Sequence, residues 1–453
     1  MNDPDRFDPA AFKMFRVLDR SFDEATKTAS LHYAFDEGPS FVETVIFETA
    51  TGSPTPVDRA RLEGALLHLH IAAGTSYYKA AAPPIVSVES GALSPTEVAF
   101  HQHLYDDGLR EFAVANRLAV PRPVSVSSMF SRRDRPVPTD RRRPGGVVVP
   151  IGGGKDSMVL IEALRPLRPR LLAVNPHPLV IDLARRADLE LLVVRRELSP
   201  NLSVLNRAGA LNGHVPVTAI VSLIAAVGAA LYGYDTIAMA IERSASEETA
   251  LVNGVPVNHQ YSKSFDFERL MRGLLATAID PGLTYGSALR PYSELAIARS
   301  FASLSQYHST FCSCNTVFRQ SAGADDRWCG ACAKCRFVGL VLAPFMGREE
   351  LGAVIGRDMF ADAAEISGFA ALMSDEDKPF ECVGERRESA AAIRMLSDRP
   401  EWKTSPVVAA LSDRARAMVS EAEIEQLLTP DSDLGFPDRR VAGAVERFLA
   451  VRP

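Results

Sequence analysis

Six consecutive residues, Gly-Gly-Gly-Lys-Asp-Ser at 152–157, have the types that can hold a phosphate group. They follow the apolar run 147–151 and precede a helical pattern, which predicts a strand, a glycine turn and a helix. Glycines let backbone N–H groups approach a phosphate, and a helix N-terminus adds partial positive charge. Asp156 separates Lys155 from Ser157, which excludes a Walker A loop, and the dinucleotide pattern G-x-G-x-x-G also fails. The predicted phosphate-binding residues are Gly152, Gly153, Gly154, Lys155, Asp156 and Ser157, with Asn175 at the end of the next strand.

Five of the six cysteines lie between positions 312 and 335, in the pattern C-x-C followed by C-x-x-C-x-x-C. The acidic residues 1–15 lack the apolar core of a signal peptide, so these thiols are expected to bind metal rather than form disulfides. Short knuckles of this kind suit a closed, structural Zn²⁺ site with four thiolates, and an iron–sulfur cluster is the alternative occupant. Cys314 is nearer in sequence to the other three than Cys312, so the predicted ligands are Cys314, Cys329, Cys332 and Cys335.

The segment 242–263 concentrates polar residues directly after a predicted strand, where a substrate would lie, although a polar surface loop would have a similar composition. Proton transfer needs a base and an acid, and the sequence assigns neither. Candidate catalytic residues are Glu242, Glu247, Glu248, His259, Tyr261 and Lys263, together with the Cys382 thiol, for which an ordinary buried cysteine is the alternative. Candidate substrate-binding residues are Arg243, Asn258 and His214, the last of which could instead be structural.

Predicted strands alternate with predicted helices from residue 146 onward, which indicates an α/β fold with a parallel sheet covered by helices on both faces. The glycine turn, Asn175 and Glu242 all follow such strands, so we expect them at the carboxyl edge of the sheet, where ligands bind. A smaller N-terminal α/β domain with its linker is expected at 1–143, the phosphate-binding domain with the cysteines at 144–345, and a helical C-terminal region at 346–453.

The composition of the 453 residues is that of an ordinary globular protein, and its net charge of −6 gives no indication of a nucleic-acid partner. Residues 217–234 carry no charge, and the length of this stretch is at the lower limit for a membrane span. Their Ala, Gly, Ser and Val content fits a buried helix packed on a sheet better. The protein is therefore expected to be cytoplasmic, without a membrane partner.

Two resemblances narrow the chemistry. Gly153-Gly154-Lys155-Asp156-Ser157 is similar to the end of the S-G-G-x-D-S loop (PP-loop) of the N-type ATP pyrophosphatases, with Gly152 replacing the leading serine. More specifically, the chain resembles the UDP-N-acetyl-α-D-muramoyl-L-alanyl-L-glutamate epimerases of the MurL family from about residue 30 to its end. The segments that carry this resemblance are GGGKDS, IERSASEE, NGVPVNHQYSKS, FCSCN, WCGACAKCRF and KPFECVGE.

The resemblance implies an adenine-nucleotide α-hydrolase-like fold and a small-molecule substrate, a UDP-linked muramoyl dipeptide used in peptidoglycan synthesis. It implies inversion of the terminal L-glutamate with ATP consumed to AMP and pyrophosphate, Mg²⁺ on the phosphates, and a structural Zn²⁺. Two other functions fit the turn and the cysteines alone. One is an ATP-dependent nucleobase- or tRNA-modifying enzyme of the pyrophosphatase group, and the other is a non-catalytic nucleotide-binding zinc module.

Overall fold

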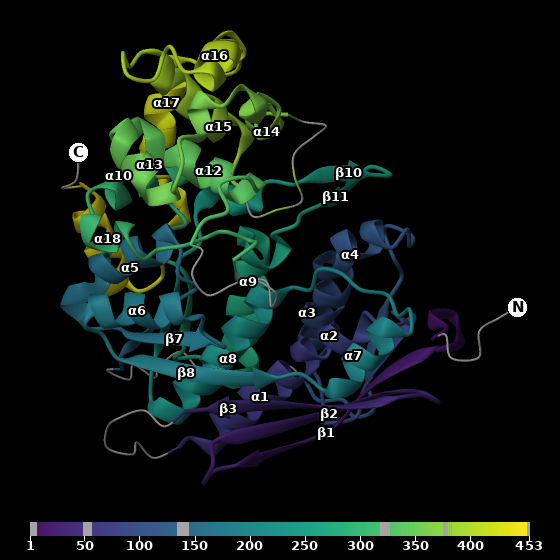
Figure 1. Ribbon diagram of the computed structural model, residues 1–453. Coiled ribbons are helices and arrows are strands. Elements are labelled where there is room, and N and C mark those ends of the chain that lie inside the picture. Colours follow the sequence, from purple (N-terminus) through teal and green to yellow (C-terminus); the bar gives the residue numbers. More distant parts are fainter. Residues whose placement is uncertain are drawn as a thin grey trace, which may run out of the picture.

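The computed structural model describes residues 7–48, 57–133, 145–317, 327–374, 379, 381 and 383–450. Its centre is a ten-stranded sheet in the order β12-β9-β6-β7-β8-β3-β2-β1-β4-β5 (Figure 1). Neighbours from β12 to β8 are parallel, and so are β1, β4 and β5, whereas the pairs between β8 and β1 are antiparallel. The prediction of an α/β fold with a mostly parallel sheet is thus confirmed. The strands are β1 (Met14–Asp23), β2 (Thr28–Phe35), β3 (Ser40–Phe47), β4 (Ile85–Val88), β5 (Ser125–Ser128), β6 (Val147–Pro150), β7 (Arg170–Val174), β8 (Leu191–Glu197), β9 (Thr236–Met239) and β12 (Thr284–Ser287).

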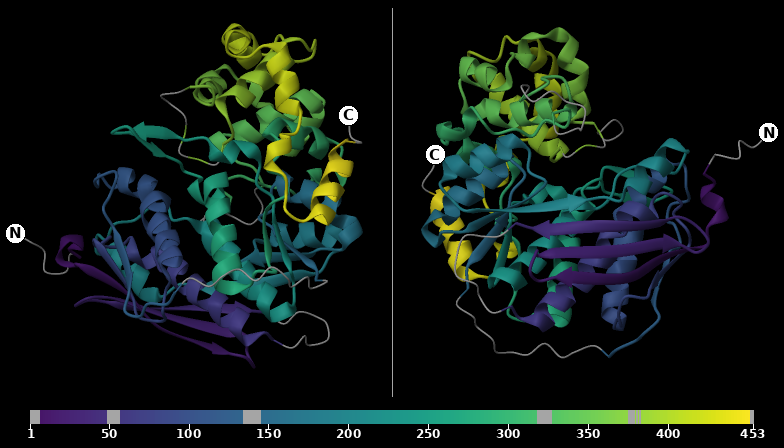
Figure 2. Two further views of the ribbon diagram at one scale, coloured as in Figure 1. Left: turned by 180° about the vertical axis from the view of Figure 1, so that it is seen from behind. Right: turned by 60° about the horizontal axis from the view of Figure 1, so that its bottom comes forward.

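The N-terminal strands and the strands after residue 145 form one continuous sheet. β3 pairs antiparallel with β8 over Thr44–Phe47, and the buried Glu43 carboxylate accepts two hydrogen bonds from the Arg196 guanidinium, at 2.7 and 3.0 Å. Figure 2 shows the N-terminal strands running on from the strands of the other part. The expected N-terminal piece therefore contributes an edge of the same sheet that carries the glycine turn.

Helices cover both faces because the central strands are apolar on both sides. In β6, Val147 and Val149 enter one hydrophobic core and Val148 enters the other, as the two-residue period of a strand requires. The first core contains α5 (Lys155–Leu164), α6 (Pro178–Ala187), α10 (Glu294–Ala302) and α12 (Ala333–Leu342). The second contains α1 (Arg59–Ala73), α3 (Pro95–Asp106), α8 (Val217–Tyr232) and α9 (Phe265–Leu274).

The uncharged stretch 217–234 is mostly α8, a buried helix packed against α1 and the sheet. A Cβ built on Gly228 would lie 3.4 Å from Leu172 and 3.5 Å from Leu192, which are ordinary contact distances, so this face of α8 lies directly against β7 and β8. Within the described ranges, no helix combines the length and apolar character needed to cross a bilayer.

The C-terminal region is helical, as predicted, and it extends the first core instead of folding apart. α18 (Arg439–Ala450) packs on α5, and α15 (Arg386–Ser397) packs on α12 and α16 (Pro406–Met418). In Figure 1, α15 and α16 lie at the top, and α18 lies at the left beside α5. The other elements of this region are α13 (Arg348–Ile355), α14 (Ile366–Ala371) and α17 (Glu421–Leu428).

Candidate functional site

The glycine turn joins β6 to α5, and each glycine has a different environment. Gly153 has φ +89°, a conformation that favours glycine, and its carbonyl accepts a hydrogen bond from the Cys312 N–H at 3.1 Å. A Cβ on Gly154 would lie 2.8 Å from Ser313 Oγ. No described atom lies within 4 Å of a Cβ built on Gly152. Packing therefore leaves room for a side chain such as serine at position 152.

Helix α5 starts at Lys155, within the segment 152–157, and no side chain of the described residues caps its N-terminus. The N–H groups of its first turn therefore retain the positive end of the helix dipole for an anion. Ser157, in this turn, is buried. The predicted strand, glycine turn and helix are thus all present here.

Three carboxylates meet beside this turn. Oxygens of Asp156, Glu242 and Glu294 lie within 4.8 Å of one another, and the Lys155 ammonium pairs with both Asp156 and Glu294. Lys155, Glu242 and Glu294 are 2%, 6% and 2% exposed. Three acids and one lysine offer several carboxylate oxygens with excess negative charge, a donor set that could hold a divalent cation. We call these four residues the acidic cluster.

The charges in the acidic cluster shift one another's protonation. Burial raises the pKa of Glu294 to about 7, although Lys155 opposes this rise. Burial acts against the charged form of Lys155, but Asp156 and Glu294 outweigh it and raise the Lys155 pKa. Glu388, on α15 behind the cluster, is fully buried and its pKa is raised well above the usual range. A bound cation would favour the ionised form of Glu294.

Glu294 is a cluster member that the sequence reasoning missed. It is the first residue of α10, whose N-terminus is capped by Ser293 and follows β12 at the carboxyl edge of the sheet. The sequence pattern that could have identified it is Ser293-Glu294. A serine followed by an acid is typical of a helix N-terminus, and this helix follows a strand.

The segment from Glu242 to Lys263 is held at both ends by one buried arginine. Arg290, 1% exposed, donates to the carbonyls of Glu242 at 2.8 Å and of Lys263 at 2.7 Å. Its charge is balanced by Glu268, at 2.9 Å. Between these ends the chain forms a hairpin of β10 (Ala250–Val252) and β11 (Val255–Val257), which projects from the body in Figure 1. We call residues 243–264 the hairpin loop.

The candidate catalytic and substrate-binding residues of the hairpin loop do not lie at one site. Glu248, Asn258 and Tyr261 line a cavity of about 650 Å³ against Asp107 and Arg110. Burial, and next the nearby Asp107 carboxylate, raise the pKa of Tyr261. These three residues are positioned to contact a ligand in that cavity.

The other candidates are engaged elsewhere. Glu247 accepts from Arg386 at 3.0 Å, Lys263 donates to Gln260 at 3.1 Å, and Arg243 lies beside α17 in a separate hollow. His259 and His214 lie together against Glu111, a residue that the sequence did not indicate. Cys382 lies outside the described residues.

Asn175 stands at the end of β7, at the expected edge. Its amide both accepts from the Arg196 N–H and donates to the Arg196 carbonyl, each at 2.8 Å. These two bonds link the ends of β7 and β8, so the side chain supports the edge near the turn.

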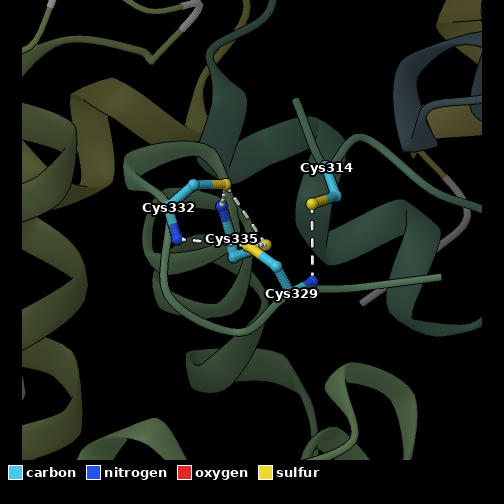
Figure 3. Close-up of side chains that lie close together, drawn as sticks. All are labelled: Cys314, Cys329, Cys332 and Cys335. Atoms are coloured by element: carbon cyan, nitrogen blue, oxygen red, sulfur yellow. Dashed lines mark hydrogen bonds between the residues drawn. The ribbon is translucent and has the colours of Figure 1, made fainter. Parts of the chain in front are cut away.

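The four predicted metal ligands come together in the structure. The Sγ atoms of Cys314, Cys329, Cys332 and Cys335 lie within 4.8 Å of one another and point to a common centre (Figure 3). The Cys329–Cys335 and Cys332–Cys335 sulfurs are 3.7 and 3.4 Å apart. Sulfurs on a tetrahedral zinc at about 2.3 Å are about 3.8 Å apart, so the arrangement fits that ion closely.

Backbone N–H groups also point at these sulfurs, as in zinc knuckles. The N–H groups of Cys329, Cys332 and Cys335 lie 3.4 Å from the sulfurs of Cys314, Cys329 and Cys332 respectively. Hydrogen bonding from Cys335 lowers the pKa of Cys332 to about 4, so thiolate forms readily here. The donor set of this cysteine cluster suits a closed tetrahedral metal.

Cys312 is not a member of that cluster. Its thiol donates to the Arg327 carbonyl at 2.6 Å, and burial raises its pKa to about 12, so it stays protonated. Cys312 and Ser313 instead contact Gly153 and Gly154. The segment leading into the cysteine cluster therefore packs on the glycine turn.

Comparison with known proteins gives matches over most of the chain. A family model described as the MurL N-terminal domain matches residues 6–288, and one described as the MurL C-terminal domain matches residues 310–426. A protein named UDP-N-acetyl-alpha-D-muramoyl-L-alanyl-L-glutamate epimerase from Xanthomonas oryzae pv. oryzae is 40% identical over 406 residues, covering 89% of this chain and 90% of its own.

Proteins of the same name occur in two further organisms. The Salinispora tropica protein is 42% identical, covering 87% of each chain, and the Micromonospora protein is 40% identical, covering 92% of this chain and 94% of its own. No solved structure matches the chain.

Proposed function

The chain belongs to the MurL family of epimerases, and from this premise we propose that it inverts the terminal L-glutamate of a UDP-N-acetylmuramoyl-L-alanyl-L-glutamate to the D form through an acyl-adenylate. As a member of this family it is an isomerase. The acidic cluster at the glycine turn carries the proposal, because it joins a phosphate-binding backbone to a site for a divalent cation. Epimerisation alone would need neither.

The chemical reason for adenylation is the charge on the substrate carboxylate. Removing the α-proton beside a carboxylate would place two negative charges on adjacent atoms. Attack of the carboxylate on the α-phosphate of ATP forms the mixed anhydride and releases pyrophosphate. The anhydride carbonyl then accepts the electron pair of the broken C–H bond. Reprotonation on the opposite face and hydrolysis of the anhydride give the D epimer and AMP.

The residues at the glycine turn have separate roles in the first step, the adenylation of the substrate carboxylate. The N–H groups at the start of α5 hold phosphate oxygens, as in the PP-loop that residues 153–157 resemble. Lys155 stabilises negative charge on the leaving group. Asp156, Glu242 and Glu294 would hold Mg²⁺, which neutralises the pyrophosphate as it leaves.

We assign the cysteine cluster a structural zinc. All four positions would be filled by thiolates, which leaves no site for substrate. The zinc would fix the segment that places Cys312 and Ser313 against Gly153 and Gly154. In this way the zinc contributes to the shape of the turn without touching ATP.

The test follows AMP, pyrophosphate and the α-hydrogen together in deuterated water. With the UDP-muramoyl dipeptide ending in L-glutamate, we expect one AMP and one pyrophosphate per inversion and deuterium at the α-carbon. Inversion without AMP would exclude the adenylate, and AMP without deuterium would exclude epimerisation by proton transfer. AMP release that requires a deazapurine or tRNA would favour a nucleobase-modifying enzyme, and ATP binding without pyrophosphate release would indicate a non-catalytic module.

A further inference from the structure

A cluster of proton-accepting side chains lies where the N-terminal part of the chain meets the hairpin loop. Glu111 comes from α4 (Arg110–Ala115), His214 from the segment before α8, and His259 from the segment after β11. Glu111 Oε2 is 2.6 Å from His259 Nδ1 and 4.0 Å from His214 Nδ1. The side chains of His259, Glu111 and His214 are 13%, 16% and 29% exposed. The cluster is thus shielded but reachable by a ligand.

Contacts outside the cluster hold its three segments in place. The Lys79 ammonium donates to Asn212 Oδ1 at 2.6 Å and to the Gly213 carbonyl at 3.1 Å, which fixes the segment before His214. Val257, at the end of β11, packs with Ala113 of α4, and the His259 N–H donates to Thr249 Oγ1 at 3.2 Å. The cluster geometry is therefore set by the fold and does not depend on the Glu111–His259 bond alone.

Residues next to the cluster in sequence line a cavity. Arg110, which precedes Glu111, and Asn258, which precedes His259, both line the cavity of about 650 Å³, together with Tyr261. This volume suits part of a nucleotide-sugar ligand. The hairpin loop that carries His259 follows directly after Glu242 of the acidic cluster, so one segment connects the two clusters along the chain.

The geometry favours proton transfer over metal binding. The 2.6 Å between His259 Nδ1 and Glu111 Oε2 is the length of a charge-assisted hydrogen bond. Two nitrogen or oxygen ligand atoms on one tetrahedral zinc would be about 3.3 Å apart. Lys79 and Lys263 also face His214 and would repel a cation. Burial, and next the neighbouring His259, lower the pKa of His214 to about 4, so His214 is neutral beside the pair.

The two imidazoles must serve the same face of the substrate. An α-carbon between two bases needs each nitrogen about 3 Å away on opposite sides, a separation of about 6 Å filled by substrate. The ring centroids of His214 and His259 are only 4.6 Å apart, so the rings contact each other. No carbon fits between them.

We propose that Glu111 is a positioning residue that orients His259, and that His259 transfers the α-proton on one face only of the activated glutamyl carbon. This rests on the proposed epimerase function. For the epimer whose Cα–H faces His259, the C–H bond breaks, an N–H bond forms on the imidazole, and the electron pair moves into the anhydride carbonyl. A group elsewhere delivers a proton to the opposite face. His214 lies on the His259 side and does not serve the second face.

The test uses the full-length protein with ATP and the dipeptides ending in L- and in D-glutamate, each in deuterated water. The variants are His259→Gln, Glu111→Gln, Glu111→Asp and His214→Gln. For one epimer only, deuterium incorporation is expected to fall on the order of 100-fold in His259→Gln and about 10-fold in Glu111→Gln. Glu111→Asp restores part of that loss, and His214→Gln affects the same epimer or neither. AMP release with both epimers is retained, which also shows that the variants fold.

A matched control is His32→Gln, since His32 also lies near a carboxylate, 3.9 Å from Asp19, on strand β2 away from the hairpin loop. It should leave both epimers unaffected. Equal loss for both epimers, no loss in His259→Gln, or loss for opposite epimers in the two histidine variants would overturn the proposal. So would a bound metal, beyond that of the cysteines, that is absent from Glu111→Gln. If the wild-type protein releases no AMP or incorporates no deuterium, the proposed function itself fails.

Discussion

The cysteine cluster and the acidic cluster both adjoin the glycine turn, but they are assembled in opposite ways. The cysteines come from one short segment, and their own N–H groups point at the sulfurs. The acidic cluster draws Asp156, Glu242 and Glu294 from three connections that the parallel sheet brings to one edge. The cysteine cluster is complete once a metal binds, whereas the acidic cluster keeps unbalanced charge. The cysteine cluster is thus assembled locally, whereas the acidic cluster, to which we assign the chemistry, depends on the long-range pairing of the sheet.

The largest expected effect comes from removing the one cation of the acidic cluster. In Lys155→Met, pyrophosphate release should fall by about 10²–10³-fold, because a group that stabilises developing charge is lost. Deuterium incorporation should fall with it, since adenylation precedes proton transfer in the proposed mechanism. Both are measured under the conditions of the wild-type assay.

Lys155→Arg serves as a second variant, because unpaired buried carboxylates in Lys155→Met could unfold the chain. Arg185→Gln, which removes an exposed cation from the neighbouring helix α6, is the control and should retain activity. Wild-type pyrophosphate release in folded Lys155→Met would show that the acidic cluster is only structural.

The cysteine cluster should respond differently from its neighbour Cys312. Cys314→Ser is expected to lose bound zinc and lower the unfolding temperature by roughly 10 °C, because metal binding adds to folding free energy. Cys312→Ser should keep the zinc, since that thiol donates to the Arg327 carbonyl. Metal content by elemental analysis and thermal unfolding measure both. Zinc loss in Cys312→Ser with retention in Cys314→Ser would reverse the ligand assignment.

The contrast between the clusters also explains what the sequence could predict. The cysteine spacing predicted the four residues that come together, because a short chain limits where its thiols can go. The strand–helix alternation placed Asp156 and Glu242 at one edge, and the same reasoning could have found Glu294 after β12. Glu111 gave no such signal, because its contact with His259 joins residues 148 apart in sequence. Asn175 was placed at the right edge, but sequence could not show that its amide binds Arg196.

Glu294 of the acidic cluster should make its own contribution to the pH dependence of stability. Burial raises the pKa of Glu294 from 4.5 to about 7, so the folded chain holds this proton more tightly than the unfolded chain. The resulting stabilisation is full below pH 4.5 and is lost as the pH rises through about 7. Without divalent metal, the wild-type free energy of unfolding should fall on the order of 2–3 kcal/mol relative to Glu294→Gln over this range. Urea unfolding at several pH values measures the difference, and parallel curves for the two proteins would contradict it.

The smallest effect should come from the turn itself, and it separates the three glycines. A side chain at Gly153 requires φ +89°, so Gly153→Ala should destabilise the turn by about 1–3 kcal/mol. A Cβ at Gly154 meets only Ser313 Oγ, which can rotate away, so Gly154→Ala should destabilise the turn less than Gly153→Ala. Gly152→Ser has open space around its Cβ within the described structure, so it should fold like the wild type. Its hydroxyl would add one hydrogen bond to a phosphate oxygen, and the KM for ATP should fall by about two- to tenfold. A higher KM for ATP in Gly152→Ser would contradict this expectation. It would mean that bound substrate fills the space beside Gly152, so that glycine leaves room for the muramoyl substrate where a serine would contact a phosphate.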